Sequence, residues 1–172
     1  MKMDKKKAKM LALALLAFAP MTSHAFDWEW DTKYLGDLHA GYNTSCKVGG
    51  AKTYSAAAIL GTLQGVQLNQ YLSAGIGVDA WMLTHYYSGQ GLRFGMAAFV
   101  DMRGYYPVKE KFSPFLDLAL GADFNLKPSG GGGAFYCEFG PGFRYKQLGF
   151  SCGLQHTGKK YNHFYAKIGL FF

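Results

Sequence analysis

A two-residue alternation of apolar and polar side chains, sustained over segments of about a dozen residues, constrains this chain most. In residues 162–172, one face carries Phe164, Ala166, Ile168, Leu170 and Phe172, and the other carries His163, Tyr165, Lys167, Gly169 and Phe171. Residues 71–82, 92–105, 114–126 and 134–146 show the same alternation. Successive side chains of a β-strand point to opposite faces, so this period indicates strands.

The alternating runs predict eight strands, at residues 33–43, 54–67, 71–82, 92–105, 114–126, 134–146, 148–156 and 162–172. They are longer than the ~5–6 residues usual in globular proteins. They match instead the ~9–11 residues of a tilted strand that crosses a membrane. We therefore predict an all-β chain, an eight-stranded antiparallel up-and-down transmembrane β-barrel.

The predicted connections alternate as well. Residues 68–70, 106–113 and 146–147 form compact links, whereas the connections at 44–53, 84–91, 127–133 and 157–161 are polar or glycine-rich. An even-stranded barrel with both ends of the chain on one side predicts this alternation of periplasmic turns and longer external loops.

Charged residues make up 17% of the chain, against ~25% in an average soluble domain. On the predicted parity, one polar face collects charges of both signs, which would pair within a narrow lumen. This predicted lumen network comprises Asp37, His39, Asp79, Arg93, Asp101, Arg103, Asp117, Asp123, Glu138, Arg144 and Lys167. The alternative is a soluble barrel or sandwich, in which the apolar rows fill a core and these charges face water.

Aromatic residues gather toward the predicted strand ends, as in the interfacial girdle of a membrane barrel. They are Tyr34, Tyr42, Tyr54, Tyr71, Trp81, Tyr105, Phe115, Tyr145 and Phe164.

The first 25 residues differ from the rest of the chain. Five lysines lie among residues 2–9, an apolar run follows at 10–19, and small residues lead up to Ala25. This order predicts a signal peptide cleaved after Ala25 and a barrel domain over 26–172. The segment holds five Lys and one Asp, so the net charge falls from +7 to +3 without it. Nucleic acid is therefore not an expected partner.

The last residues, YAKIGLFF, resemble the C-terminal signal by which the outer-membrane assembly machinery recognises barrel substrates, with Tyr165, Ile168, Leu170 and Phe172 carrying it. Four further segments resemble strands of small outer-membrane β-barrel proteins of the OmpA/OmpX-like group, often labelled "porin family". They are residues 34–42 (YLGDLHAGY), 61–78 (GTLQGVQLNQYLSAGIGV), 97–103 (AAFVDMR) and 113–121 (SPFLDLALG).

This resemblance implies a barrel in the outer membrane of a Gram-negative bacterium, with outer-membrane lipids and the assembly machinery as partners. It carries no catalytic residues across. Eight strands leave no wide aqueous channel, whatever the label.

Few residues suggest chemistry. Asp37, His39 and Ser73 are candidates for a hydrolytic triad, but a triad is defined by geometry. Near the last connection, His156, His163, Lys159 and Lys160 are candidates for an anion site. Cys46, Cys137 and Cys152 match neither a disulfide framework nor a zinc motif. We expect no enzyme activity, no cofactor and no metal.

The expected role is structural or surface-binding: a barrel anchored in the membrane that presents four external loops to an unidentified ligand. Two alternatives stay open, a narrow channel for ions or small solutes and a barrel enzyme that acts on lipid.

Overall fold

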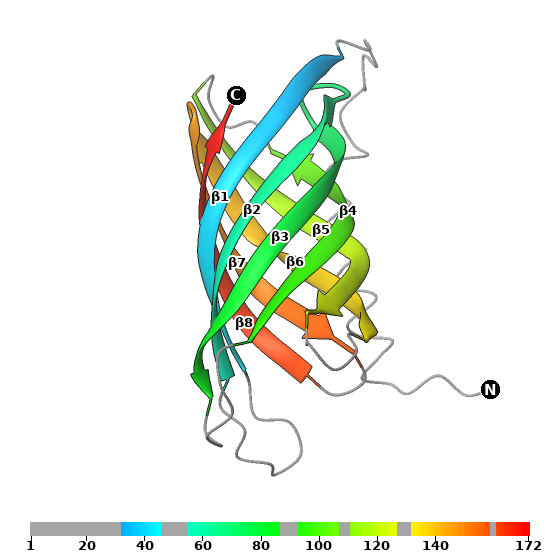
Figure 1. Ribbon diagram of the computed structural model, residues 1–172. Helices are drawn as coiled ribbons and strands as arrows, with labels where there is room; N and C mark the ends of the chain where they lie inside the picture. Colours follow the sequence, from blue (N-terminus) through cyan, green and yellow to red (C-terminus); the bar gives the residue numbers. More distant parts are fainter. Residues whose placement is uncertain (1–31, 46–54, 87–92, 107–110, 127–131, 159–160) are drawn as a thin grey trace, which may run out of the picture.

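The computed structural model describes residues 32–45, 55–86, 93–106, 111–126, 132–158 and 161–172. Eight strands form one closed antiparallel barrel, in which each strand pairs with the next and β1 pairs with β8 (Figure 1). Their bounds are β1 Lys33–Ser45, β2 Ser55–Gln67, β3 Leu72–Tyr86, β4 Phe94–Tyr105, β5 Phe112–Asn125, β6 Gly133–Tyr145, β7 Leu148–Thr157 and β8 Tyr161–Phe171. The predicted eight-stranded barrel is confirmed. The largest difference is at the C-terminal end of β3, which continues to Tyr86. The predicted signal peptide lies outside the described residues, and among those residues no helix is long and apolar enough to span a membrane.

The barrel closes where its first and last strands meet. β1 and β8 pair from Asp37 opposite Phe171 to Ser45 opposite His163. Beyond them, Gly36 and Phe172 exchange two backbone hydrogen bonds of 2.8 and 2.9 Å. A side chain at position 36 would meet the ring of Phe172, so the glycine lets that ring lie against the strand. Closure gives the edges of β1 and β8 their hydrogen-bond partners, so the barrel has no free strand edge.

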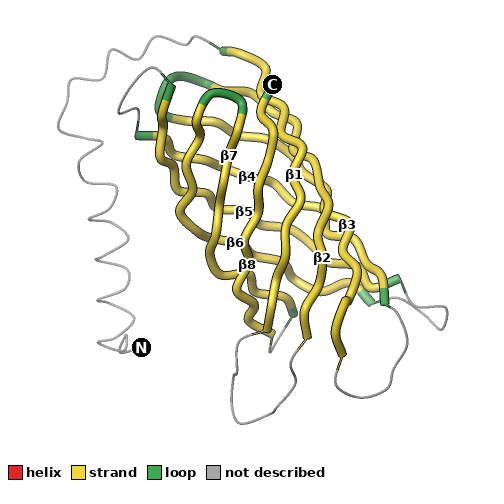
Figure 2. The backbone as a smooth tube through the Cα atoms, turned by 90° about the vertical axis from the view of Figure 1, so that its left-hand side faces the viewer, coloured by secondary structure: helices red, strands yellow, loops and turns green. Residues whose placement is uncertain are grey.

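The connections at 68–71, 106–111 and 146–147 lie at the barrel end where β1 begins and β8 ends (Figure 2). We call this the turn end. The connections at 46–54, 87–93, 126–132 and 158–160 join strands at the opposite end. The connection at 158–160 is shorter than the predicted 157–161, because β7 and β8 pair as far as Thr157 and Tyr161.

The outer wall of the barrel is apolar. Every strand places large hydrophobic side chains on it, and Ile76, Leu60 and Ile168 are 68, 61 and 60% exposed. Exposed apolar surface on this scale marks contact with a membrane or another protein.

The inner face is more apolar than the sequence indicated. Beside charges and glycines it buries Leu35, Leu63, Phe99, Tyr136 and Phe171. β2 partly reverses the expected pattern, since it buries Ile59 and Leu63 and turns polar side chains outward. Large side chains fill an eight-stranded lumen more completely than small ones.

The predicted aromatic girdle is correct only in part. Tyr34, Tyr42, Tyr145 and Phe164 are exposed on the outer wall, and Tyr71 lies in a turn. Tyr105 and Phe115 are instead buried in the lumen, and Trp81 faces inward on β3. Their place in the two-residue alternation, and not their nearness to a strand end, decides which face they take. Tyr54 lies outside the described residues.

Candidate functional site

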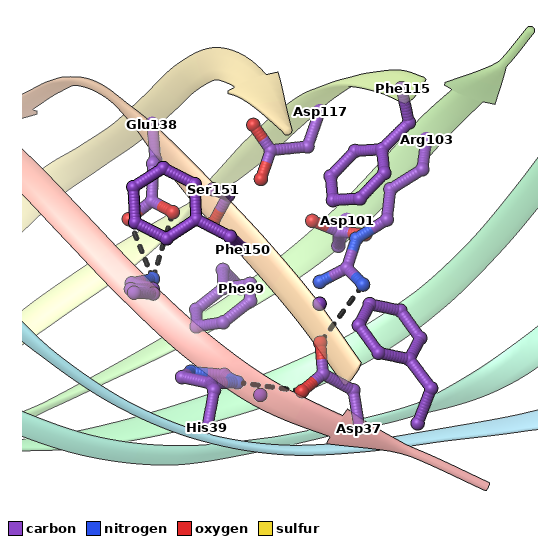
Figure 3. A pocket seen from close by; sticks show the side chains of 14 residues that line it. Asp37, His39, Phe99, Asp101, Arg103, Phe115, Asp117, Glu138, Phe150 and Ser151 are labelled. Atoms are coloured by element: carbon purple, nitrogen blue, oxygen red, sulfur yellow. Dashed lines mark hydrogen bonds and ion pairs between the residues drawn. The ribbon is translucent and has the colours of Figure 1, made fainter. Parts of the chain in front are cut away.

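Charged side chains gather inside the barrel, at positions near the middle of their strands, and Figure 3 shows most of them from close by. They include two buried permanent cations, Arg103 and Lys167, and His39. Around them lie five buried carboxyl groups, those of Asp37, Asp79, Asp101, Asp117 and Glu138. None of these eight side chains belongs to a residue more than 6% exposed. We call this set the lumen network.

Arg103 lies at the turn-end side of the lumen network. Its Nη1 is 2.9 Å from Asp37 Oδ2, and its Nε is 3.0 Å from Asp101 Oδ1. Its guanidinium carbon also lies 5.4 Å from the ring centre of Phe115 and 5.3 Å from that of Phe171. Two carboxylates and two aromatic faces thus surround one cation.

Lys167 joins strands that are not neighbours. Its Nζ donates to both Glu138 oxygens at 2.8 Å and to Asp79 Oδ2 at 3.0 Å. The three residues come from β8, β6 and β3, so these bonds run across the lumen. The Tyr136 hydroxyl donates to Glu138 Oε2 at 2.5 Å, which leaves Glu138 well supplied with donors.

His39 connects the arginine and the lysine. Its Nδ1 lies 3.3 Å from Asp37 Oδ1, and its Nε2 lies 2.8 Å from Asp79 Oδ1. The contact has room because residue 61 is glycine: a Cβ there would stand 2.0 Å from Asp79 Oδ1 and 2.5 Å from His39 Nε2. The contacts therefore form one continuous chain from Asp101 through both cations to Glu138.

Asp117 lies beside this chain, and the other three residues of the predicted network lie apart from the lumen network. Asp123 accepts a hydrogen bond from the indole N–H of Trp81 at 2.7 Å. Arg144 donates to the carbonyl of Lys146 at 2.9 Å, at the turn end. Arg93 is half-buried just before β4, at the opposite end. All three have the inward parity, but they lie near strand ends.

Sequence reasoning missed the phenols and amides of the lumen. The Tyr165 hydroxyl donates to Asp117 Oδ1 at 3.0 Å, and Asn43 donates to Gln155 at 2.7 Å. Inward parity could have identified all of these residues, including Tyr136. Their residue types alone could not, because tyrosine is equally at home on the outer wall near a membrane interface.

A small cavity lies within the lumen network. Its volume is about 20 Å³, and its lining includes Asp101, Asp117, Glu138 and Lys167 (Figure 3). A cavity needs ~10–15 Å³ on this measure to hold a water molecule. This space therefore has room for about one water, and its polar walls offer it partners.

The candidate triad is wrong. Ser73 pairs in register with Arg103, whereas His39 contacts Asp79, six positions further along β3. At ~3.3 Å per residue, that separation is about 20 Å. The serine hydroxyl therefore cannot reach the imidazole.

Only the two histidines of the candidate anion site are described, and they take opposite faces of the barrel wall. His156 Nδ1 hydrogen-bonds to Asn162 at 2.6 Å on the outer face, while His163 takes the inward parity of β8. Lys159 and Lys160 lie outside the described residues. Cys137 and Cys152 are free thiols, and Cys46 lies outside the described residues. No group of three or more His, Cys, Asp or Glu side chains in the described segments is arranged to hold a metal ion.

The residues of the predicted assembly signal divide between two faces. Ile168, Leu170 and Phe172 are exposed on the outer wall, whereas Tyr165 is buried in the lumen against Asp117.

No family model and no curated protein matches this chain. Among solved structures, Neisserial surface protein A (NspA) is similar, with a TM-score of 0.53 and 9% identity over 81% of this chain and 97% of that one. The translocator domain of the autotransporter NalP from Neisseria meningitidis aligns with a TM-score of 0.34 and 11% identity, over 96% of this chain and 95% of that one. At 9% identity, the likeness to NspA shows the barrel fold alone.

Proposed function

We propose that the chain is an integral outer-membrane β-barrel of a Gram-negative bacterium, of the small OmpA/OmpX-like type, with a structural or surface-binding role. Support comes from the division of its two faces, apolar side chains outside and the lumen network inside. Such a wall is suited to lipid, and closure leaves no strand edge for the lipid to solvate. The four connections opposite the turn end would face the exterior, where an extracellular ligand could bind.

The lumen network favours an anchor over a channel, and this observation carries the proposal. Lys167 and Arg103 each bridge carboxylates across the lumen, and the cavity beside them is only about 20 Å³. Hydrated ions cannot pass a space of one water without parting these pairs. The barrel would thus hold its external connections in place and keep the membrane sealed.

The testing experiment begins with a membrane fraction and a gel. We expect the protein in the outer-membrane fraction, and we expect the unheated, detergent-purified barrel to migrate differently from a boiled sample. A soluble protein without a mobility shift would contradict the proposal and favour the soluble barrel.

The second candidate function is a narrow channel, and planar bilayers separate it from the first. We expect the wild-type barrel to be silent, and Arg103→Ala to weaken the seal because Asp37 and Asp101 lose their cation. Stable unitary currents from the wild type, altered by Arg103→Ala, would instead establish a channel.

We further propose that the barrel has no enzymatic activity and no cofactor. Mass spectrometry of outer-membrane lipids incubated with the purified protein tests the lipid-enzyme alternative. A new lipid product that disappears in His39→Ala would overturn this part of the proposal.

The proposed partners are outer-membrane lipids and the outer-membrane assembly machinery. The outward row of Ile168, Leu170 and Phe172 supports the second, because it leaves these three side chains accessible on the outer wall. Truncation of Phe172 should slow membrane assembly in cells more than refolding in detergent.

A further inference from the structure

A groove of about 420 Å³ crosses the outer wall over β2, β3, β4 and β5. These strands are consecutive neighbours in the barrel, and β2, β3 and β4 can be followed side by side in Figure 1. One wall of the groove is a row of outward side chains in register, Gln64, Ile76, Val100 and Leu120. The volume falls within the ~300–1,000 Å³ of small-molecule sites.

The opposite wall of the groove is low. It is the next outward row, in which Thr62 and Val78 are followed by Ala98. Gly77 and Gly121 lie between the two rows and have the inward parity of their strands, so the floor of the groove is backbone. The groove is therefore a fixed feature of the backbone and of short side chains, not of a movable loop.

One end of the groove is polar. The Thr62 hydroxyl donates to the carbonyl of Asp37 at 2.9 Å, and Gln64 Nε2 donates to Thr62 Oγ1 at 2.8 Å. The Tyr34 hydroxyl donates to Gln64 Oε1. A glutamine amide has two N–H groups, and one of them finds no partner among the described residues. On a face in contact with hydrocarbon, an unmatched donor is costly.

The polar end of the groove lies toward the turn end of the barrel. Gln64 is three positions from the end of β2 at Gln67, roughly 10 Å along the strand. From there the groove continues over Ile76, Val100 and Leu120, which are exposed and apolar. The groove thus has a hydrogen-bond donor near the proposed membrane–water interface and apolar side chains further into the membrane. This order matches a phospholipid, in which the ester carbonyls lie nearer the interface than the acyl chain.

We propose that this groove binds one acyl chain of a glycerophospholipid from the leaflet at the turn end, with an ester carbonyl accepting a hydrogen bond from Gln64 Nε2. The inference rests on the proposed membrane location. It assigns one specific lipid site to an outer wall whose other lipid contacts would exchange freely with the bulk membrane.

The test uses the refolded mature barrel, stripped of lipid in detergent and titrated with palmitoyl-oleoyl phosphatidylethanolamine under native mass spectrometry. Ala98→Phe fills the groove. Ala166→Phe places the same ring on the outer wall of β8, away from the groove, and serves as the matched control. We expect one retained lipid on the wild type and on Ala166→Phe, and at least tenfold weaker retention on Ala98→Phe.

Gln64→Leu tests the polar end separately. It should lower retention of the phospholipid but leave unchanged the retention of its dialkyl ether analogue, which has the same head group and chains but no ester carbonyl. Equal retention of phospholipid by all variants would reduce the groove to ordinary lipid contact and overturn the proposal. A dimer that Ala98→Phe dissociates would identify a second copy as the occupant and would equally overturn it. In both of these outcomes the barrel would still show its heat-dependent gel mobility, so only the lipid site would be rejected. Loss of that mobility difference and of membrane association would instead reject the proposed membrane location.

Discussion

Replacing Lys167 with methionine should lower the stability of the barrel strongly. Among single substitutions of charged residues in the lumen network, we expect only those at Arg103 to cost as much or more. Lys167 Nζ makes three contacts of 2.8 to 3.0 Å with Glu138 and Asp79. The lumen network holds five carboxyl groups against two permanent cations, so Lys167→Met leaves Arg103 as the only permanent cation among them. Methionine keeps much of the side-chain volume, which makes charge the main variable.

The expected cost follows from burial. Removing one partner of a buried ion pair typically costs about 3–5 kcal/mol, because the remaining charge has neither water nor a counter-ion. Here Asp79 retains His39 at 2.8 Å and Glu138 retains the Tyr136 hydroxyl, so neither carboxylate is left without a donor. We therefore expect a loss near the lower end, about 3 kcal/mol.

The assay is reversible urea unfolding of the barrel in phospholipid vesicles, followed by the gel mobility of folded and unfolded forms. Lys111→Met, in an exposed turn-end residue, is the control and should change the free energy of unfolding by less than about 0.5 kcal/mol. Lys167→Met combined with Glu138→Gln should recover about 1 kcal/mol or more, since it removes one of the unpaired charges. A single variant within about 1 kcal/mol of wild type, or a double variant no better than the single, would refute this account of the lumen network.

Three further outcomes are expected. Gly61→Val should destabilise the folded barrel by at least about 1–3 kcal/mol in the same urea assay, because its side chain would displace the Asp79 carboxylate from its partner; wild-type stability would contradict the close approach. Phe172→Ala should lower the temperature at which the unheated gel band is lost, since the terminal ring covers the seam between β1 and β8, and an unchanged temperature would show that the backbone bonds alone hold it. Cys137 and Cys152 should not cross-link to each other under copper–phenanthroline oxidation, as peptide mass mapping will show; an internal disulfide would mean that the β6–β7 register is wrong.

The fold was predictable because a barrel repeats one simple rule. Alternation identifies strands and sorts their side chains between two faces, although β2 buries Ile59 and Leu63 and turns polar side chains outward. The same rule placed Asp37, Asp101 and Lys167 on the inner face. The girdle prediction is wrong for Tyr105 and Phe115 because it follows residue type and nearness to a strand end. Both residues have the inward parity of β4 and β5, and both are buried.

The partners within the lumen network were less accessible to prediction. Parity states which face a side chain takes but not its height along the barrel axis, and that height depends on the stagger of all eight strands together. Asp123 and Asp117 have the same parity on the same strand, yet only Asp117 reaches the centre. The error about Ser73 has the same origin: its face was correct and its height was not.

That dependence on stagger also makes the contacts of the lumen network depend on one another. Lys167 on β8 holds Asp79 on β3 and Glu138 on β6, while Arg103 on β4 holds Asp37 on β1. These contacts connect strands that share no backbone hydrogen bonds, so a shift in the register of one strand would separate several of them at once. His39 joins the Arg103 and Lys167 groups through Asp37 and Asp79, so the two cations belong to one set of contacts. The arrangement that makes the partners hard to predict from sequence is therefore the one that keeps the lumen closed.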